Sequence, residues 1–294
     1  MSSTKNLFAF VRQEVVPLEK AFLHVSDLAI QRGYGIFDFL KIQDGQPLFL
    51  ESYLDRFHSS AELMQLSVPL GREELVGAVA DLIHRNDLPL SGMKLILTGG
   101  YSENGYNLAS PNLLLIQQPL SLPTQAQTEQ GIRVITQEYV REIPAAKTIN
   151  YTMGIRLLQQ IRERMAEDVL YHLGGEVSEF PRSNVFMVTE DGRVVTPKDN
   201  ILRGITRKHV LELAGNRYQA EEGTVTLPDL LQAREVFLTS TTKRILPIVQ
   251  VDDRVIGKGK PGPVAQALLE DLIALENDQR ASLFPLSGGP AKEK

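Results

Sequence analysis

The chain has 294 residues, of which 43% are hydrophobic and 23% are charged, a composition typical of a soluble globular protein with a sizeable core. At this length, two domains are the natural expectation. The net charge of −5 gives no electrostatic reason to expect a nucleic acid or an anionic membrane as a partner. Because the sequence contains no cysteine, disulfides, thiolate metal ligands and cysteine nucleophiles are excluded.

The sequence predicts neither a targeting segment nor a membrane span. The first ten residues contain no apolar run followed by a small-residue cleavage site. No stretch approaches the roughly 20 apolar residues that cross a bilayer. We therefore expect a cytoplasmic protein.

Residues 1–118 show the mixed periodicity of a small α/β domain, and the chain as a whole is predicted to be α+β. Strands are predicted over 7–16, 93–98 and 112–117, helices over 54–64 and from Arg72, and a hairpin over 38–50 with Asp44-Gly45 as its turn and Leu48, Phe49 and Leu50 in its second strand. A polar segment with Pro119 and Pro123 then predicts a linker over 119–130.

A second, larger domain is predicted over 131–278. Its predicted strands begin near Ile132, Val169, Val185, Arg193, Glu235 and Ile245, with Gly174-Gly175 and Asp191-Gly192 as turns and helices over 205–213 and 263–275. A helix after Lys147 is predicted to bury Ile155, Leu158, Ile161 and Met165 on one face. The polar residues 279–294 are expected to form a mobile tail.

Several classes of active site find no support in the sequence. The five histidines are scattered, no pair has ligand spacing on one helix face, and no carboxylate cluster accompanies them, so no metal site is predicted. There is no G-x-S-x-G elbow, no Walker lysine loop and no G-x-G-x-x-G motif after a strand.

Two residues stand out by their context. Lys147 leads into the predicted apolar helix, and Glu179 lies between Val177 and the apolar run at Val185, which predicts that its side chain points inward from a sheet. Most lysines near helix starts and most glutamates are solvated surface residues. Only their combination with other motifs favours a shared chemical role.

Those motifs occur in order over nearly the whole chain. They are Arg32-Gly33-Tyr34-Gly35-Ile36-Phe37-Asp38, Tyr53-Leu54-Asp55-Arg56-Phe57, Lys147-Thr148-Ile149-Asn150-Tyr151, Val177-Ser178-Glu179 with Ser183-Asn184-Val185-Phe186, Thr196-Pro197, Leu202-Arg203-Gly204-Ile205-Thr206-Arg207 and Thr239-Ser240-Thr241-Thr242. On these motifs the chain resembles the class IV, or fold-type IV, enzymes that depend on pyridoxal 5'-phosphate. The resemblance implies a two-domain fold with a small N-terminal domain and a larger C-terminal domain that binds the cofactor.

The resemblance also implies roles around the cofactor ring. Lys147 would form a Schiff base with the cofactor aldehyde and would move the proton after substrate displaces it. Glu179 would face the pyridine nitrogen and keep the ring protonated. Tyr151 would lie near the ring hydroxyl, and Leu202 would pack on the ring face.

A second group would bind the cofactor phosphate. Arg56 would clamp it with its planar guanidinium, and Ile205 and Thr206 would present backbone N–H groups at a helix N-terminus. Ser240, Thr241 and Thr242 would add donors from another loop. Without the family resemblance, the same residues would be interpreted as an ordinary surface arginine, a helix cap and a polar strand end.

The family contains D-amino acid transaminases, branched-chain L-amino acid aminotransferases and aminodeoxychorismate lyases, and the shared cofactor residues do not separate them. Where the D-amino acid transaminases carry an arginine and a histidine, this chain has Asn104 and Tyr106, and the Gly105-Tyr106 pair resembles the lyases. Lys147-Thr148-Ile149-Asn150 and Thr239–Thr242 favour the D-amino acid transaminases.

We therefore predict a transaminase that moves an amino group between a D-amino acid and a 2-oxo acid. We predict that the anchor of the substrate carboxylate is relocated to Arg32, with Lys94 as an additional cation, because a buried carboxylate needs a cation or several donors. Phe37 and Tyr106 are further expected substrate contacts. The resemblance implies a homodimer, and the alternative of an inactive cofactor-binding protein is disfavoured because Lys147 and Glu179 are both present.

Overall fold

A computed structural model describes residues 7–282, which form two compact units. The first unit comprises residues 7–121 together with Ala146–Asn150 and 277–282, and the second comprises Leu122–Ala145 and Tyr151–Glu276. The short segment around Lys147 thus belongs with the first unit, although it follows more than twenty residues of the second in the chain. Among the described residues, no helix is both long enough and apolar enough to cross a membrane.

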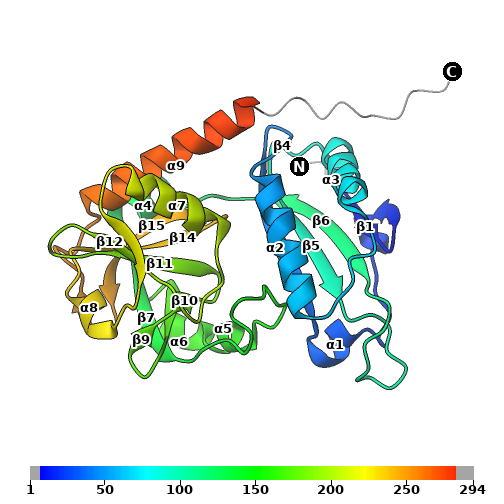
Figure 1. The fold of residues 1–294 in the computed structure, drawn as a ribbon, viewed down its shortest axis with the longest axis horizontal. Helices are drawn as coiled ribbons and strands as arrows, with labels where there is room; N and C mark the ends of the chain where they lie inside the picture. The colour runs from blue at the N-terminus through cyan, green and yellow to red at the C-terminus, as the bar shows by residue number, and fades with distance from the viewer. Residues whose placement is uncertain (1–6, 283–294) are drawn as a thin grey trace. The chain divides into compact units, whose positions relative to one another are not determined.

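The first unit is built on a six-stranded sheet of order β2-β1-β6-β5-β3-β4. Its elements are β1 (Phe8–Val11), β2 (Glu14–Pro17), α1 (Leu28–Arg32), β3 (Gly35–Gln43), β4 (Gln46–Pro47), α2 (Leu50–Leu63), α3 (Arg72–Asn86), β5 (Leu90–Thr98) and β6 (Leu113–Pro119). The side chains of Ile36, Leu40 and Ile42 alternate along β3 and are fully buried. The helix α2 runs along this sheet and buries Leu54 and Phe57 (Figure 1).

Backbone conformation explains where the first unit differs from prediction. The run predicted as one strand over 7–16 is a hairpin, because Arg12 and Gln13 adopt left-handed φ angles of 50° and 70° between β1 and β2. The predicted turn at Asp44-Gly45 is confirmed, but only β4 pairs beyond it. Phe49, with φ of 55°, is the N-cap of α2, so Phe49 and Leu50 do not extend the strand.

The second unit contains a ten-stranded mixed sheet whose main path is β13-β12-β11-β14-β15-β7-β8-β9. Its elements are α4 (Gln125–Gln130), β7 (Ile132–Glu138), α5 (Thr152–Arg156), α6 (Leu158–Glu163), β8 (Asp168–Leu173), β9 (Glu176–Val177), β10 (Glu179–Phe180), β11 (Ser183–Val188), β12 (Val194–Pro197), α7 (Ile205–Gly215), β13 (Ala220–Gly223), α8 (Leu227–Leu231), β14 (Glu235–Ser240), β15 (Arg244–Val251), β16 (Arg254–Val255) and α9 (Pro263–Ser282).

Alternation along the central strands creates two apolar layers in this unit. On one side, Phe186 and Phe237 stack with ring centroids 5.3 Å apart and pack with Val210 of α7 and Leu268 of α9. The other side buries Val185, Leu238 and Leu246 with residues near α8. Figure 1 shows α7 and α9 together beside the strands β14 and β15. The layers fix the sheet firmly, which matters because β11 and β14 carry the site residues.

The predicted helix after Lys147 is wrong in its buried face. The helical stretch is divided at Leu157 into α5 and α6. Leu157 and Ile161 are buried, whereas Ile155, Leu158 and Met165 are exposed.

Two of the predicted irregular segments contain regular structure. Part of the predicted linker, 125–130, is the helix α4, which begins with a capping box between Thr124 and Gln127. Of the predicted mobile tail, residues 279–282 complete α9, and 283–294 lie outside the described residues.

Candidate active site

Lys147 lies in a short extended segment that is held by the N-terminal half of β3. The Phe37 N–H donates to the Lys147 carbonyl at 2.9 Å, and the Ile149 N–H donates to the Gly35 carbonyl at 3.0 Å. Ile36 and Thr148 form the bridge between these bonds. A Cβ at Gly35 would approach the Leu97 carbonyl oxygen to 2.7 Å, so glycine is needed for this close packing of backbones.

Two lysine side chains share one aromatic ring on this face of the sheet. The Lys147 Nζ lies 4.7 Å from the centroid of Phe37, and the Lys94 Nζ lies 5.7 Å from the same centroid. A ring face attracts a cation within about 6 Å. Phe37 therefore brings the predicted reactive amine and a predicted substrate anchor together.

Arg56 is fixed close to the same segment by a buried carboxylate. Its Nε and Nη2 donate to the two oxygens of Asp38 at 2.9 and 2.6 Å, and the Asp38 side chain is fully buried. One turn further along α2, the Ser60 hydroxyl accepts the Lys147 backbone N–H at 3.1 Å. Arg56 and Lys147 are thus brought together, and Asp38, which the sequence did not single out, orients the guanidinium.

We expect Asp38→Asn to weaken binding of pyridoxal 5'-phosphate about tenfold, because an amide replaces the two-point contact that orients Arg56. Equilibrium dialysis of the apoprotein measures this change. Asp55→Asn is the matched control. Asp55 precedes Arg56 on α2, but its carboxylate forms an exposed pair with Arg72 at 2.8 Å. An equal effect of both substitutions would contradict a specific role of Asp38.

In the second unit, Glu179 is buried, as predicted, with 4% of its surface exposed. Its Oε1 accepts from the Arg141 Nε at 2.7 Å, and its Oε2 accepts the Leu202 N–H at 2.8 Å. Arg141 also donates to the Pro144 carbonyl, which is in the turn that precedes Lys147. These bonds hold Glu179 as a buried carboxylate. Arg141 was not among the predicted site residues. Its position shortly before the lysine motif is the only feature of the sequence that indicates a role near Lys147.

The start of α7 is held next to Glu179 through the backbone of Leu202. The Leu202 carbonyl accepts from the Asn184 Nδ2 at 2.8 Å, so both polar groups of this peptide unit have side-chain partners. The N-cap of α7 is Gly204, which provides no side-chain hydrogen bond. A Cβ at this glycine would lie 2.2 Å from the Asn184 Oδ1. The first N–H groups of α7, on Ile205 and Thr206, therefore begin beside the Glu179 cluster without a side-chain cap.

The predicted serine and threonine donors lie at the end of β14, next to Asn184 in the sheet register. Thr239 pairs with Asn184, which in turn pairs with Glu179 on β10, so these three side chains share one face of the sheet. Ser240, Thr241 and Thr242 follow directly. On this face, the Thr239 hydroxyl oxygen is buried and has no hydrogen-bond partner among the described residues. An orphaned hydroxyl and an uncapped helix start fit a site for a polar, anionic group.

Three further predicted site residues are Tyr151, Arg32 and Tyr106. Tyr151 is the N-cap residue of α5. Arg32 is exposed at the end of α1, where its Nη1 donates to the Gln31 carbonyl at 3.0 Å. Tyr106, in the 99–107 loop, has 81% of its surface exposed. Among the contacts of described residues, none joins Arg32 or Tyr106 to Lys147.

Tyr171 lies on β8 beside the Glu179 cluster, and its phenol makes the stability of the protein depend on pH. Burial raises the pKa of the Tyr171 phenol above its ordinary value, and the charges of Tyr139, Asp168 and Glu179 add to this rise while Arg141 opposes it. The folded protein thus keeps this phenol protonated at a pH where the unfolded chain ionises it.

We therefore expect the free energy of unfolding to fall by roughly 1 kcal/mol per pH unit above about pH 10 because of this residue, and Tyr171→Phe to remove that part of the loss. Below pH 10 the phenol is protonated in both states and contributes no slope. Urea unfolding at several pH values measures the effect, with Tyr106→Phe as an exposed control. Identical slopes for Tyr171→Phe and the unsubstituted protein would contradict the assignment.

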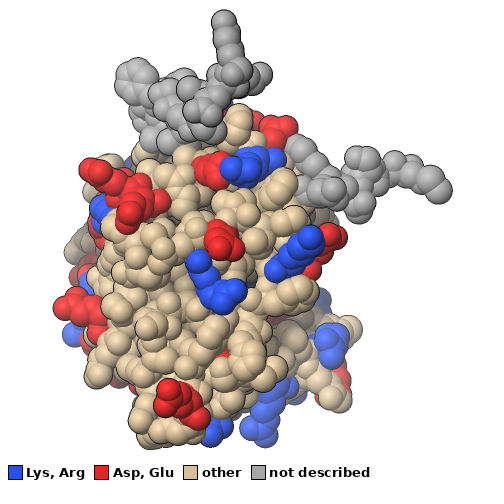
Figure 2. Space-filling view, turned by 90° about the vertical axis from the view of Figure 1, so that its right-hand side faces the viewer, with Lys and Arg blue, Asp and Glu red and all other residues tan. Residues whose placement is uncertain are grey.

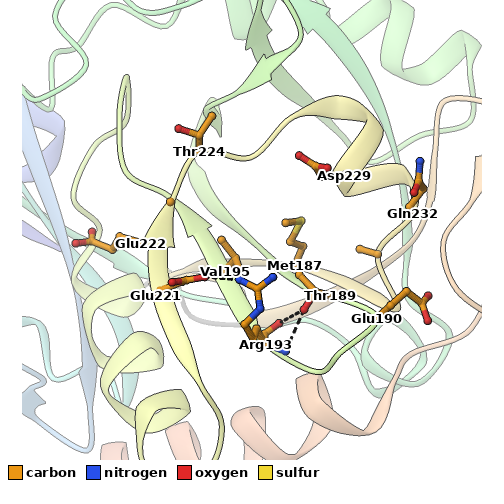
Figure 3. A pocket seen from close by; sticks show the side chains of 12 residues that line it. Met187, Thr189, Glu190, Arg193, Val195, Glu221, Glu222, Thr224, Asp229 and Gln232 are labelled. Carbon is orange, nitrogen blue, oxygen red and sulfur yellow. Dashed lines mark hydrogen bonds and ion pairs between the residues drawn. The ribbon is translucent and has the colours of Figure 1, made fainter.

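A separate surface groove lies over β12, β13 and α8 and contains none of the predicted site residues. It encloses about 490 Å³ and is lined by Arg193, Glu221, Glu222 and Asp229, among others (Figure 3). Arg193 pairs with Glu221, Arg207 pairs with Glu222, and Asp229 caps α8 through Thr226. These charges already serve structural partners, so we do not assign the groove a role in catalysis. Among the described residues, no cluster of three potential metal ligands is found.

The first unit thus places a lysine close to an oriented arginine, and the second places a buried acid beside an uncapped helix start. The sequence profile of the family described as Amino-transferase class IV matches residues 35–251. The chain belongs to the class IV aminotransferases, and its cofactor is pyridoxal 5'-phosphate.

The relatives with similar sequences carry the names of two different aminotransferases, and a solved structure shares the fold. A D-alanine aminotransferase of Listeria monocytogenes serotype 4b (strain F2365) is 28% identical over 267 residues, covering 88% of this chain and 92% of the relative. A putative branched-chain-amino-acid aminotransferase of Methanocaldococcus jannaschii is 30% identical over 276 residues, covering 89% and 93%. The branched-chain amino acid aminotransferase of Escherichia coli shares the fold, with a TM-score of 0.87 at 24% identity over 94% of this chain and 96% of that one.

Proposed function

We propose that this aminotransferase moves an amino group between a D-amino acid and a 2-oxo acid. The observation that carries the proposal is the pair of lysines on Phe37, because the Lys94 ammonium can bind a substrate carboxylate within reach of the Lys147 amine. The D-alanine aminotransferase relative and the Lys147–Asn150 and Thr239–Thr242 motifs support the choice of a D-amino acid.

The proposed chemistry assigns one task to each group of residues. Bound pyridoxal 5'-phosphate supplies an aldehyde that carries the amino group and a ring that accepts electrons from the substrate Cα. The Lys147 Nζ holds the aldehyde and, once substrate replaces it, takes the proton from the substrate Cα. Its backbone does not move in this scheme, since Ser60 and β3 hold both polar groups of Lys147.

Glu179 keeps the ring nitrogen protonated, and Arg141 supports it. The Glu179 carboxylate is oriented by Arg141 and by the Leu202 N–H. It would accept a hydrogen bond from the protonated ring nitrogen. In this assignment Leu202 would contact the ring, and Tyr151 would lie near the ring hydroxyl.

The cofactor phosphate is assigned to Arg56, to the N–H groups of Ile205 and Thr206, and to the hydroxyls of Ser240, Thr241 and Thr242. The partial positive charge of a helix N-terminus and a planar guanidinium both favour a dianion. The missing side-chain cap on α7 is consistent with this role, because the ligand takes the place of the cap.

We assign the substrate carboxylate to Lys94 and an apolar substrate contact to Phe37. Arg32, at the end of α1, and Tyr106, in the 99–107 loop, are the further proposed substrate contacts. Lys94→Met is then expected to raise KM about tenfold or more through loss of a charge-assisted bond, with a smaller change in kcat. Lys20→Met, which removes an exposed lysine elsewhere in the same unit, should leave KM unchanged.

Branched-chain L-amino acid transfer is the second candidate, and the 30% identical Methanocaldococcus relative favours it. The deciding experiment mixes cofactor-loaded enzyme separately with D-alanine, D-glutamate, L-leucine and L-isoleucine. The loss of the visible absorbance of the bound cofactor is then followed. We expect the D-amino acids to react. A response to L-leucine or L-isoleucine alone would contradict the proposal, and release of pyruvate from aminodeoxychorismate without an amino acceptor would indicate a lyase.

We further propose that the protein works as a homodimer. Phe22, Val25, Ile30 and Tyr106 expose 73%, 69%, 57% and 81% of their surface in one loop region of the first unit. The Ser102 N–H donates to the Ser26 carbonyl, so the segment that contains Phe22 and Val25 is bonded to the 99–107 loop. Exposed apolar groups of this size favour contact with a partner. On the face of the molecule drawn in Figure 2, basic and acidic side chains are scattered among uncharged ones. Light scattering tests this, and a monomer at micromolar concentration would contradict it.

A further inference from the structure

Arg207, in the first turn of α7, is an unusual buried arginine. Its residue is 3% exposed, and its guanidinium donates to the Thr196 Oγ1 at 3.2 Å, to the Pro197 carbonyl at 2.7 Å and to the Glu222 Oε1 at 2.6 Å. Thr196 in turn donates to the Val185 carbonyl at 2.8 Å. One side chain thus ties the start of α7 to β12 and β13, and through Thr196 to β11.

This placement does not serve the helix itself. A cation near a helix N-terminus opposes the helix dipole, and removing a guanidinium from water is costly even when it is paired. The N-cap residue Gly204 also leaves the first N–H groups without a side-chain partner. The start of α7 thus combines a buried cation with a missing side-chain cap, and both are unfavourable for the helix. Their presence indicates a role other than helix stability.

The geometry supplies that reason. Asn184 contacts the segment before α7 through the Leu202 carbonyl and lies against Gly204, while Arg207 fixes the first turn from β12 and β13. The two contacts come from different strands and together fix both the position and the direction of the helix start. Glu222 neutralises the guanidinium, so Arg207 acts through geometry and not as a direct ligand of an anion.

We propose that Arg207 is a positioning residue that aims the N–H groups of Ile205 and Thr206 at the cofactor phosphate. This inference rests on the proposed phosphate-binding role of α7. Its consequence is specific: loss of Arg207 should weaken contacts to the phosphate and should leave contacts to the rest of the cofactor intact.

A comparison of pyridoxal 5'-phosphate with pyridoxal isolates this effect, because both ligands carry the aldehyde and ring but only one carries the phosphate. Dissociation constants for both are measured on apoprotein by equilibrium dialysis. We expect Arg207→Met to weaken pyridoxal 5'-phosphate binding about tenfold or more, the loss of a hydrogen bond to a charged group, with pyridoxal binding unchanged. Arg207→Lys should recover only part of the loss, because an ammonium lacks the planar fork.

Two further variants keep the test decisive. Arg193→Met is the matched control: Arg193 pairs with Glu221, the neighbour of Glu222 on β13, at 2.6 Å, and Figure 3 shows this pair in the surface groove. It should change neither constant. Arg207→Met combined with Glu222→Met removes both charges of the ion pair, so it avoids an unpaired Glu222 if the single variant fails to fold.

The outcomes separate the two levels of the proposal. If the unsubstituted apoprotein binds both ligands equally, the proposed phosphate site itself is wrong. If it prefers pyridoxal 5'-phosphate and the Arg207 variants keep that preference, or lose affinity for both ligands equally, only the role of Arg207 is wrong. A selective loss in the Arg207 variants, absent in Arg193→Met, supports it.

Discussion

Lys147→Ala is expected to lower kcat by about 10⁴-fold, because the substitution removes the amine that we propose holds the cofactor aldehyde and takes the proton from the substrate. The fold should survive, since Ser60 and β3 contact only the backbone of Lys147. Steady-state transamination assays measure the loss, and thermal unfolding of the apoprotein checks the fold.

Lys94→Ala is the matched control for this prediction. It removes the second ammonium over the same Phe37 ring. It should affect substrate binding and leave the visible absorbance of the bound cofactor in place, whereas Lys147→Ala should abolish that absorbance. If Lys147→Ala kept both absorbance and activity, Lys147 would not be the catalytic residue.

Arg141→Met is expected to destabilise the protein by about 3–5 kcal/mol, because it leaves the Glu179 carboxylate buried without its cation. The Glu179 side chain is 6% exposed and the Arg141 side chain 12%, so water replaces little of the lost contact. Urea unfolding measures the change, and cofactor binding should weaken in parallel because Arg141 no longer orients the Glu179 carboxylate.

A double-mutant cycle shows whether this pair acts as a unit. Arg141→Met combined with Glu179→Gln removes both charges and should recover most of the lost stability without recovering activity. If the two substitutions simply add, the bond between Arg141 and Glu179 contributes little, and Glu179 would be held by the Leu202 N–H alone.

The features that were predictable from sequence are those set by local patterns. The hairpin of β11 and β12 was predicted because apolar runs flank Asp191-Gly192, and the inward orientation of Glu179 was predicted from its apolar neighbours. The helix α7 begins where the motif at Gly204 predicted it. In each case one short stretch of sequence determines the outcome.

The features that were not predictable depend on contacts between distant segments. Ile155, Leu158 and Met165 have helical spacing, but the fold buries the neighbouring positions Leu157 and Ile161 and leaves these three exposed. Arg141, Asp38 and Arg207 are charged residues whose burial follows only from the partners that the fold brings to them. A single sequence does not reveal these pairings, because each partner alone is typical of a surface residue.

Peptide mapping tests directly whether Lys147 holds the cofactor. Borohydride reduction of the cofactor-loaded enzyme makes the link between lysine and cofactor permanent, and mass spectrometry of the digested protein then locates the phosphopyridoxyl group. We predict that the group is found on the peptide that contains Lys147. Its presence on Lys94 instead, or its absence from every lysine, would show that Lys147 does not hold the cofactor.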